Sequence, residues 1–145
     1  MTIFIGADHR GFKIKEALKP YLKELGLEVV DLGNDHFDEN DDYPDFANAV
    51  AGKVSKNPET DKGILICGSG IGMSIAANKF ENVRAAQADK IEEAILSRKD
   101  NDANVLSLSG NFLSEQEIKE IVRAWLETPF SKEERHERRI KKIIP

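Results

Sequence analysis

The sequence predicts one α/β domain: a doubly wound, five-stranded parallel sheet with helices on both faces, followed by a C-terminal helical tail. Two observations predict this fold class. Short β-rich runs alternate with stretches of helical periodicity along the chain. The run Gly63–Cys67 is almost continuously apolar, as in a strand buried on both faces of a parallel sheet. The length of 145 residues fits a single domain, residues 1–145, because no linker-like stretch, repeat or low-complexity segment divides the sequence.

The first half of the chain predicts two strand–helix pairs. Thr2–Ile5 is a brief apolar run, and Phe12–Leu25 places its apolar side chains at helical spacing. Pro20 lies inside this helix, where it is expected to kink the helix or to leave a hydrogen bond to water. Glu28–Leu32 predicts the second strand. An acidic loop follows, and the next helix is expected to begin at Tyr43-Pro44, because proline is favoured at the first helical position.

Two further strands and helices are predicted after this point. Gly63–Cys67 is the third strand, and a glycine-rich turn leads from it into a short helix that runs through Asn78. Val83–Gln87 predicts the fourth strand. Asp89 stands three residues before Glu92, which is the spacing of a capping box, and therefore predicts the start of the next helix.

The last strand is expected at Asn104–Leu108. Ser114 and Glu117 have the spacing of a second capping box. Beyond them, apolar residues at helical spacing predict a buried helix face made of Ile118, Ile121, Val122, Trp125 and Leu126. The tail from Ser131 is polar and basic and predicts a terminal helix. This order of elements is Rossmann-like, and in such folds the functional loops lie at the carboxyl ends of the strands.

Composition narrows the classes of function. With 40% hydrophobic and 32% charged residues, the chain is not a disordered protein. The 21 Lys and Arg against 26 Asp and Glu give a net charge of −5, which argues against nucleic-acid binding. The single Cys excludes an intramolecular disulfide and a multi-thiolate zinc site. Because no signal-peptide pattern and no membrane-length apolar run is present, a cytoplasmic protein without membrane contact is expected.

Two groups of residues at the ends of predicted strands are candidates for chemistry. Asp8 and His9 directly follow the first strand, where a polar pair is costly to hold unless it is solvated or used. The alternative is that Asp8 is a helix N-cap beside an exposed neighbour, and the spacing favours neither reading.

The second group is Cys67–Ser74. Cys67 stands at a strand end, beside glycines whose N–H groups can point inward and at a helix N-terminus, an arrangement that would stabilise a thiolate. Cys67 is therefore a candidate base or nucleophile, and the same amides form a cradle for an oxyanion. The alternative is a buried, inert cysteine before a tight turn.

Other patterns are weaker. The run Gly68-x-Gly70-x-Gly72 lacks the next glycine of a dinucleotide-binding fingerprint, and Gly6–Gly11 has P-loop glycine spacing without the Lys and Ser/Thr that should follow. Asp35–Asp45 holds six acidic residues without an ordered ligand spacing, so no metal is assigned. The arginines of the tail could bind a phosphate bidentately, or could belong to an exposed helix with paired charges.

Four stretches together resemble a known family: Gly6–Gly11, Asp42–Asp45, Gly63–Lys79 and Asn101–Leu106. They look like type B ribose-5-phosphate isomerases, a family that also includes galactose-6-phosphate and allose-6-phosphate isomerases. The resemblance covers almost the whole chain, and the long central motif is highly specific.

The resemblance implies an aldose–ketose isomerase that works through a cis-enediolate without a metal or organic cofactor. Cys67 would move the proton between C1 and C2, Ser69 would assist at the oxygens, and Asp8 would act during ring opening. Further contacts to a phosphorylated sugar would come from His9, Tyr43, Gly68, Gly70, Ile71, Gly72, Ser74 and Asn101. A second subunit would hold the phosphate with Arg135, His136 and Arg139. The resemblance therefore implies a homodimer with shared sites, or a homotetramer built from it.

Two positions depart from the family pattern. Most members have His where Asp100 stands, so Asp100 would take the ring-opening role as a carboxylate, without the positive charge of an imidazolium. Asn111 stands where many members have a phosphate-binding arginine. Interconversion of ribose 5-phosphate and ribulose 5-phosphate is the expected reaction. The alternatives are an isomerase for a hexose 6-phosphate of the allose or galactose type, and a non-catalytic sugar-phosphate-binding protein.

Overall fold

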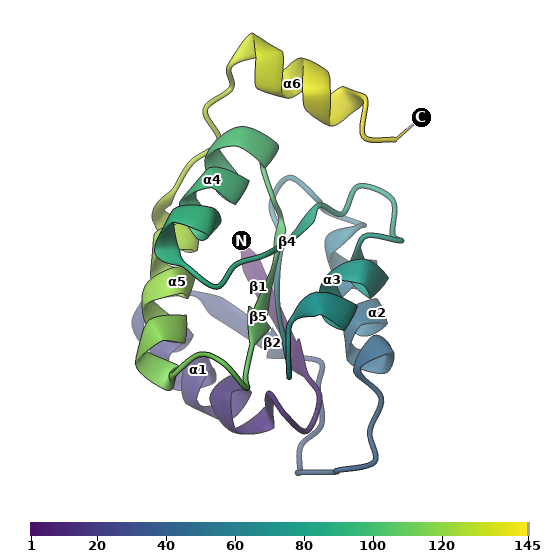
Figure 1. The fold of residues 1–145 in the computed structure, drawn as a ribbon, viewed down its shortest axis with the longest axis vertical. Helices are drawn as coiled ribbons and strands as arrows, with labels where there is room; N and C mark the ends of the chain where they lie inside the picture. The colour runs from purple at the N-terminus through teal and green to yellow at the C-terminus, as the bar shows by residue number, and fades with distance from the viewer. Residues whose placement is uncertain (145) are drawn as a thin grey trace.

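The computed structural model describes residues 1–144 (Figure 1). The strands in this part of the chain are β1 (Thr2–Ala7), β2 (Glu28–Asp31), β3 (Lys62–Cys67), β4 (Ala85–Gln87) and β5 (Val105–Ser109). They form one parallel sheet in the order β2-β1-β3-β5-β4. The helices are α1 (Phe12–Glu24), α2 (Tyr43–Val54), α3 (Ile71–Ala77), α4 (Ile91–Asn101), α5 (Glu115–Glu127) and α6 (Glu134–Lys141). The predicted five-stranded α/β fold is confirmed.

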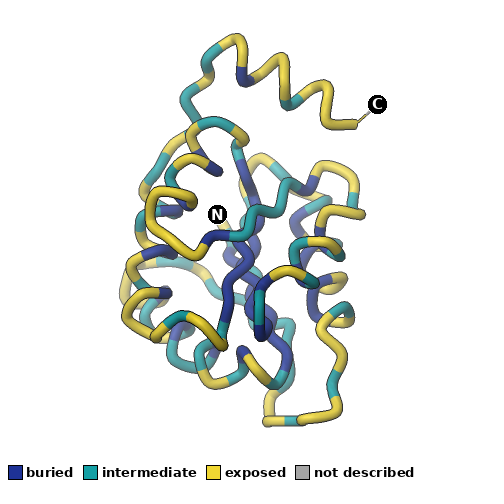
Figure 2. The backbone as a smooth tube through the Cα atoms, in the orientation of Figure 1, coloured by how far each residue is buried: buried dark blue, intermediate teal, exposed yellow. Residues whose placement is uncertain are grey.

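Helices cover both faces of the sheet. The helices α1, α4 and α5 lie on one face, and α2 and α3 lie on the other (Figure 1). Each face has its own apolar core, one around the fully buried Trp125 of α5 and the other around Met73 of α3. Figure 2 shows the buried strands running through the middle of the molecule. None of the helices described in residues 1–144 is long and apolar enough to span a membrane.

A topological switch point lies between β1 and β3, which are neighbours in the sheet. The chain leaves β1 for α1 on one face and leaves β3 for α3 on the opposite face (Figure 1). The two connections therefore diverge at the carboxyl ends of these strands, which is the position of the ligand-binding crevice in open α/β folds. At the other end of the sheet, α6 lies beyond the end of α4 (Figure 1).

Two predicted helix starts are confirmed, because α2 begins at Tyr43 and the N-cap of α5 is Ser114. Pro20 lies within α1, and Gly26 after it has a φ of +80°, the left-handed conformation that ends helices. The Ser114 Oγ accepts from the Glu117 N–H at 3.1 Å while the Glu117 Oε1 accepts from the Ser114 N–H at 3.2 Å, so the second capping box is present.

The prediction of a capping box formed by Asp89 and Glu92 is wrong. The N-cap residue of α4 is Lys90, and the Asp89 N–H donates to the Glu93 Oε2 at 2.7 Å, so Glu92 has no capping role. The Ala88 N–H still bonds to the Ser107 carbonyl at 3.2 Å, which keeps the chain extended beyond β4. The helix consequently starts later than the sequence pattern predicts.

A fully buried lysine joins α1 to the end of β2. The Lys15 Nζ donates to both carboxylate oxygens of Asp31, at 2.9 and 2.8 Å, and to the Asn34 carbonyl at 2.6 Å. Burial alone would raise the pKa of the Asp31 carboxyl, but hydrogen bonds from two lysine ammonium groups and the Gly33 N–H outweigh it and lower that pKa. The charged pair fixes the start of the loop between β2 and α2.

Removal of the Asp31 charge is expected to destabilise the fold. Asp31→Asn leaves the Lys15 ammonium buried with a weaker partner, and the free energy of unfolding should fall by about 2 kcal/mol at pH 7. Because the pKa of Asp31 is lowered on folding, its contribution is present above the ordinary value of 3.8 and is lost as the pH falls through the folded-state pKa. Urea unfolding of both proteins from pH 7 to pH 3 measures this.

The matched control is Glu115→Gln, which breaks the Lys119–Glu115 pair on the outer surface of α5. Its cost should stay below about 0.5 kcal/mol, as for other helix pairs of this spacing. Equal costs for the two variants would contradict a special role for the buried lysine.

Candidate active site

The loops after β1, β3 and β5 meet at the carboxyl end of the sheet. The Asp8 N–H donates to the Ile66 carbonyl at 3.2 Å, and the Gly110 N–H donates to the Cys67 carbonyl at 2.7 Å. A side chain on Gly72 would place its Cβ 2.6 Å from the Tyr43 ring, so the start of α2 packs directly on the first turn of α3. The structure thus brings together Asp8, His9, Tyr43, Cys67, Gly68, Ser69, Gly70, Ile71, Gly72 and Ser74.

The thiol of Cys67 sits at the bottom of the glycine-rich loop. It is buried, and its Sγ accepts a hydrogen bond from the Gly70 N–H at 3.1 Å. Gly70 has a φ of +78°, which glycine adopts without strain and which turns its N–H back toward the sulfur. A sulfur at a strand end that accepts a backbone N–H within a glycine-rich loop has the placement of a base or nucleophile.

Side chains from neighbouring strands hold the carbonyls of this loop. The Ser109 Oγ donates to the Gly68 carbonyl at 2.7 Å, and the Ser107 Oγ donates to the Gly70 carbonyl at 2.6 Å. The Gln87 Nε2 donates to the Ser69 carbonyl at 2.8 Å.

In a trans peptide the N–H points opposite to the carbonyl. Fixing three consecutive carbonyls against β4 and β5 therefore turns the following amides away from these strands. Of these amides, the Gly70 N–H donates to the Cys67 Sγ and the Ile71 N–H donates to the Ser69 Oγ at 3.2 Å. Sequence reasoning assigned no role to Ser107, Ser109 and Gln87; the signal was the two hydroxyls within the otherwise apolar β5.

The surroundings of Asp8 bear on the two roles that the sequence left open for it, a functional side chain or a helix N-cap. It is only 6% exposed, and its Oδ1 accepts from the Arg10 N–H at 3.0 Å and from the Gly11 N–H at 3.2 Å. The N-cap of α1 is Gly11, so Asp8 stabilises the preceding turn and is not the N-cap. Burial raises the pKa of the Asp8 carboxyl, and the two N–H donors offset this only in part.

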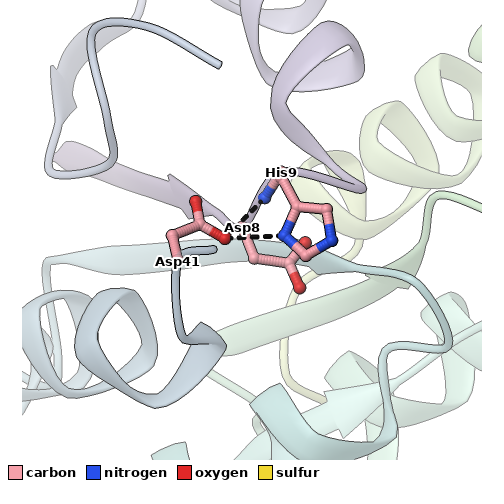
Figure 3. A group of neighbouring side chains, drawn as sticks. All are labelled: Asp8, His9 and Asp41. Carbon is pink, nitrogen blue, oxygen red and sulfur yellow. Dashed lines mark hydrogen bonds and ion pairs between the residues drawn. The ribbon is translucent and has the colours of Figure 1, made fainter. Parts of the chain in front are cut away.

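His9 is positioned by Asp41, which sequence reasoning did not single out. The Asp41 Oδ1 accepts from the His9 N–H at 3.0 Å and lies 2.7 Å from the His9 Nδ1 (Figure 3). The other oxygen of Asp41 accepts from the Asn34 Nδ2 at 2.9 Å. With Nδ1 donating to this carboxylate, the His9 Nε2 is left free to contact a ligand.

Ligand atoms of Asp8, His9 and Asp41 lie within 4.8 Å of one another, close enough to hold a metal ion. Hydrogen bonds already engage the His9 Nδ1 and Asp41 Oδ1 with each other and the Asp8 Oδ1 with two backbone N–H groups. A metal ion would therefore have to displace these donors.

The remaining predicted site residues lie at the opposite end of the sheet, by the amino ends of the strands. Asp100 and Asn101 end α4, on the far side of the sheet from Cys67, and the Asp100 Oδ1 lies 3.4 Å from the Nε2 of the buried His136 in α6. Arg135 and Arg139 are exposed on the same short helix. Within one chain, Asp100 and Asn101 lie apart from Cys67, because α4 runs back along the sheet before it ends.

Comparison with known proteins agrees with this geometry. The family model described as Ribose/Galactose Isomerase matches residues 3–143. The chain belongs to the ribose/galactose isomerase family.

Members of this family resemble the chain over nearly their full length. This chain is 49% identical to a probable ribose-5-phosphate isomerase B of Mycoplasma genitalium, over 99% of this chain and 93% of that protein. It is 43% identical to ribose-5-phosphate isomerase B of Escherichia coli, over 97% and 93% of the two chains. The crystal structure of the Mycoplasma genitalium isomerase with bound ribulose 5-phosphate superimposes with a TM-score of 0.96 at 48% identity, covering 99% of this chain and 93% of that one.

Neutralising Asp8 is expected to raise the stability of the protein and to lower its activity. A carboxyl whose pKa is raised on folding costs stability once the pH rises above its ordinary value of 3.8. Asp8→Asn should therefore raise the Tm at pH 7 by about 2–4 °C, leave it unchanged near pH 3, and lower isomerase turnover about a hundredfold. Thermal unfolding across this pH range, together with a turnover assay, measures both effects.

Asp35→Asn serves as the control, because Asp35 is exposed and its hydrogen bond to His36 lowers rather than raises its pKa. No gain in Tm is expected for it. Loss of stability in Asp8→Asn at pH 7 would contradict the free-energy cost that burial imposes on the charged Asp8 carboxylate.

Proposed function

We propose that this protein interconverts ribose 5-phosphate and ribulose 5-phosphate through a cis-enediolate, without a cofactor. The observation that carries the proposal is Cys67, whose sulfur accepts the Gly70 N–H inside a cradle of backbone amides at the switch point of the sheet. The close match to a solved isomerase with bound ribulose 5-phosphate supports the choice of sugar. Simple binding of a sugar phosphate has no need of a thiol at this position.

Each residue of the crevice has a chemical role in this reaction. The Cys67 thiolate takes the proton from C2 of the open-chain aldose and returns it to C1, so that the C1 carbonyl becomes a hydroxyl while the C2 hydroxyl becomes a carbonyl. Amides of the Gly68–Ser74 loop stabilise the negative oxygen of the enediolate. Ser69 assists proton transfer between the two oxygens, and Asp8 acts on the hydroxyls during ring opening.

A second copy of the chain would complete the site. We propose a homodimer in which the end of α4 and the helix α6 of one protomer cover the crevice of the other, bringing Asp100, Asn101, Arg135, His136 and Arg139 to the substrate. Apolar surface at that end supports the pairing: Ile143 and Ile144 are 57% and 61% exposed and line a cavity of about 430 Å³ beside Asn101. A homotetramer would contain two such dimers. The expected location of the protein is the cytoplasm.

The pair of Asp100 and His136 bears on ring opening. A carboxylate can accept a proton from the anomeric hydroxyl, and the His136 imidazole 3.4 Å away supplies the ring nitrogen that position 100 lacks. Asp100 and Asn111 are also the observations that favour a second candidate, a non-catalytic sugar-phosphate-binding protein. An isomerase for a hexose 6-phosphate of the allose or galactose type is the further alternative.

Removal of the thiol tests the reaction. Cys67→Ala is expected to lower turnover of ribose 5-phosphate at least 10³-fold, because it removes the group that takes the C2 proton in the proposed reaction. The assay compares ribose 5-phosphate, allose 6-phosphate and galactose 6-phosphate with wild type and variant, and calorimetry confirms that the variant still binds substrate. Full activity in Cys67→Ala would refute the base assignment, and binding without turnover by the wild type would favour the non-catalytic alternative.

Mixed dimers test the shared site. At ribose 5-phosphate concentrations well below the wild-type KM, homodimers carrying Cys67→Ala and homodimers carrying Arg139→Ala should each show little turnover, because the two changes disable different halves of every site. Co-expression should restore about a quarter of wild-type turnover, since half of the randomly formed dimers are mixed and each of these keeps one intact site of two. Recovery of no activity in purified mixed dimers would show that both halves come from one chain.

A further inference from the structure

The side chain of Arg10 lies across the peptide that follows Cys67. A Cβ on Gly68 would lie 2.8 Å from the Arg10 Cδ, 3.5 Å from the Arg10 Nη1 and 2.9 Å from the Asn111 Nδ2. Gly68 thus leaves room for two side chains that converge on it from different loops. The guanidinium group of Arg10 and the amide of Asn111 consequently border the same part of the crevice.

Close backbone packing gives Arg10 this position. A Cβ on Gly110 would lie 2.6 Å from the Arg10 carbonyl oxygen, and one on Gly11 would lie 2.5 Å from the Ile66 carbonyl oxygen. The Asn111 N–H also donates to the Gly68 carbonyl at 3.0 Å. The turn that carries Arg10 is therefore fixed against both β3 and the loop after β5.

Arg10 has no carboxylate within 4 Å among residues 1–144. The arginines at positions 84, 98, 123 and 135 form ion pairs, whereas Arg10 and the exposed Arg138 and Arg139 of α6 form none. The carboxylate nearest to it in sequence, Asp8, accepts hydrogen bonds from backbone N–H groups. In an acidic protein, an arginine left unpaired beside a catalytic loop is available to an anion.

We propose that Arg10 binds the phosphate group of the substrate and supplies at this point the positive charge that Asn111 lacks. The identity of the anion rests on the proposed function, whereas the anion site itself rests on the geometry. Arg10 is a binding residue in this role, and it takes no part in proton transfer. The guanidinium reaches from the β1–α1 turn to the place that a longer, charged side chain at position 111 would occupy.

Moving the charge between the two positions tests the proposal. Arg10→Gln should raise the KM for ribose 5-phosphate and the dissociation constant for inorganic phosphate at least about tenfold, with kcat changed less than about threefold. Adding Asn111→Arg to Arg10→Gln should recover most of this loss, because the new arginine reaches the same space over Gly68. Arg10→Lys should retain part of the affinity, because it keeps the charge without the planar fork.

Arg123→Gln is the control, because it removes an arginine from the outer face of α5 without touching the crevice, and it should leave both constants unchanged. Unaltered constants in Arg10→Gln, or a loss that Asn111→Arg fails to restore, would overturn the proposal.

Direct titration with inorganic phosphate separates this inference from the proposed function. If the wild type turned over no ribose 5-phosphate but bound phosphate through Arg10, only the reaction would be refuted. A wild type that bound neither phosphate nor ribose 5-phosphate would refute both.

Discussion

The parallel sheet is the constraint on which the organisation of the site depends. Every strand ends at the same edge, and every helix that follows must return to the opposite edge before the next strand begins. Asp8 and Cys67 follow strands and so lie together, whereas Asp100 ends a helix and lies at the far edge. The proposed site draws on both kinds of residue, and for this reason the proposal brings α6 and the end of α4 from a second copy of the chain.

The glycine-rich loop shows how a rigid sheet can prepare a site before any ligand arrives. Hydroxyl and amide side chains from β4 and β5 hold its carbonyls, so the orientation of its amides costs no reorganisation during the reaction. Gly70 allows the one backbone conformation that aims an N–H at the sulfur, and Gly72 gives the Tyr43 ring space to lie on α3. The glycines and the polar residues of the strands thus have complementary tasks.

Local patterns predicted the order of the elements well, because hydrophobic periodicity reports which faces are buried. The two capping-box patterns show the limit of such reasoning: Ser114 and Glu117 form the box, whereas a hydrogen bond from Ala88 to a neighbouring strand delays the helix after Asp89. Asp8 after β1 and Cys67 at the end of β3 were also identified from the sequence, because each directly follows or ends an apolar run. The pairing of Lys15 with Asp31 and of His9 with Asp41 joins positions far apart in the chain, and no local pattern encodes such contacts.

The buried lysine has a consequence for the loop between β2 and α2. Lys15 holds the Asn34 carbonyl, the Asn34 side chain holds Asp41, and Asp41 holds His9, so a chain of hydrogen bonds leads from the core to the crevice. An exposed acidic loop of this kind would ordinarily tolerate insertions and deletions. Here a change in its length would shift Asp41 relative to His9 while leaving the sheet intact. The outer side chains of this loop take no part in the chain of hydrogen bonds, whereas its length sets the position of Asp41 beside His9.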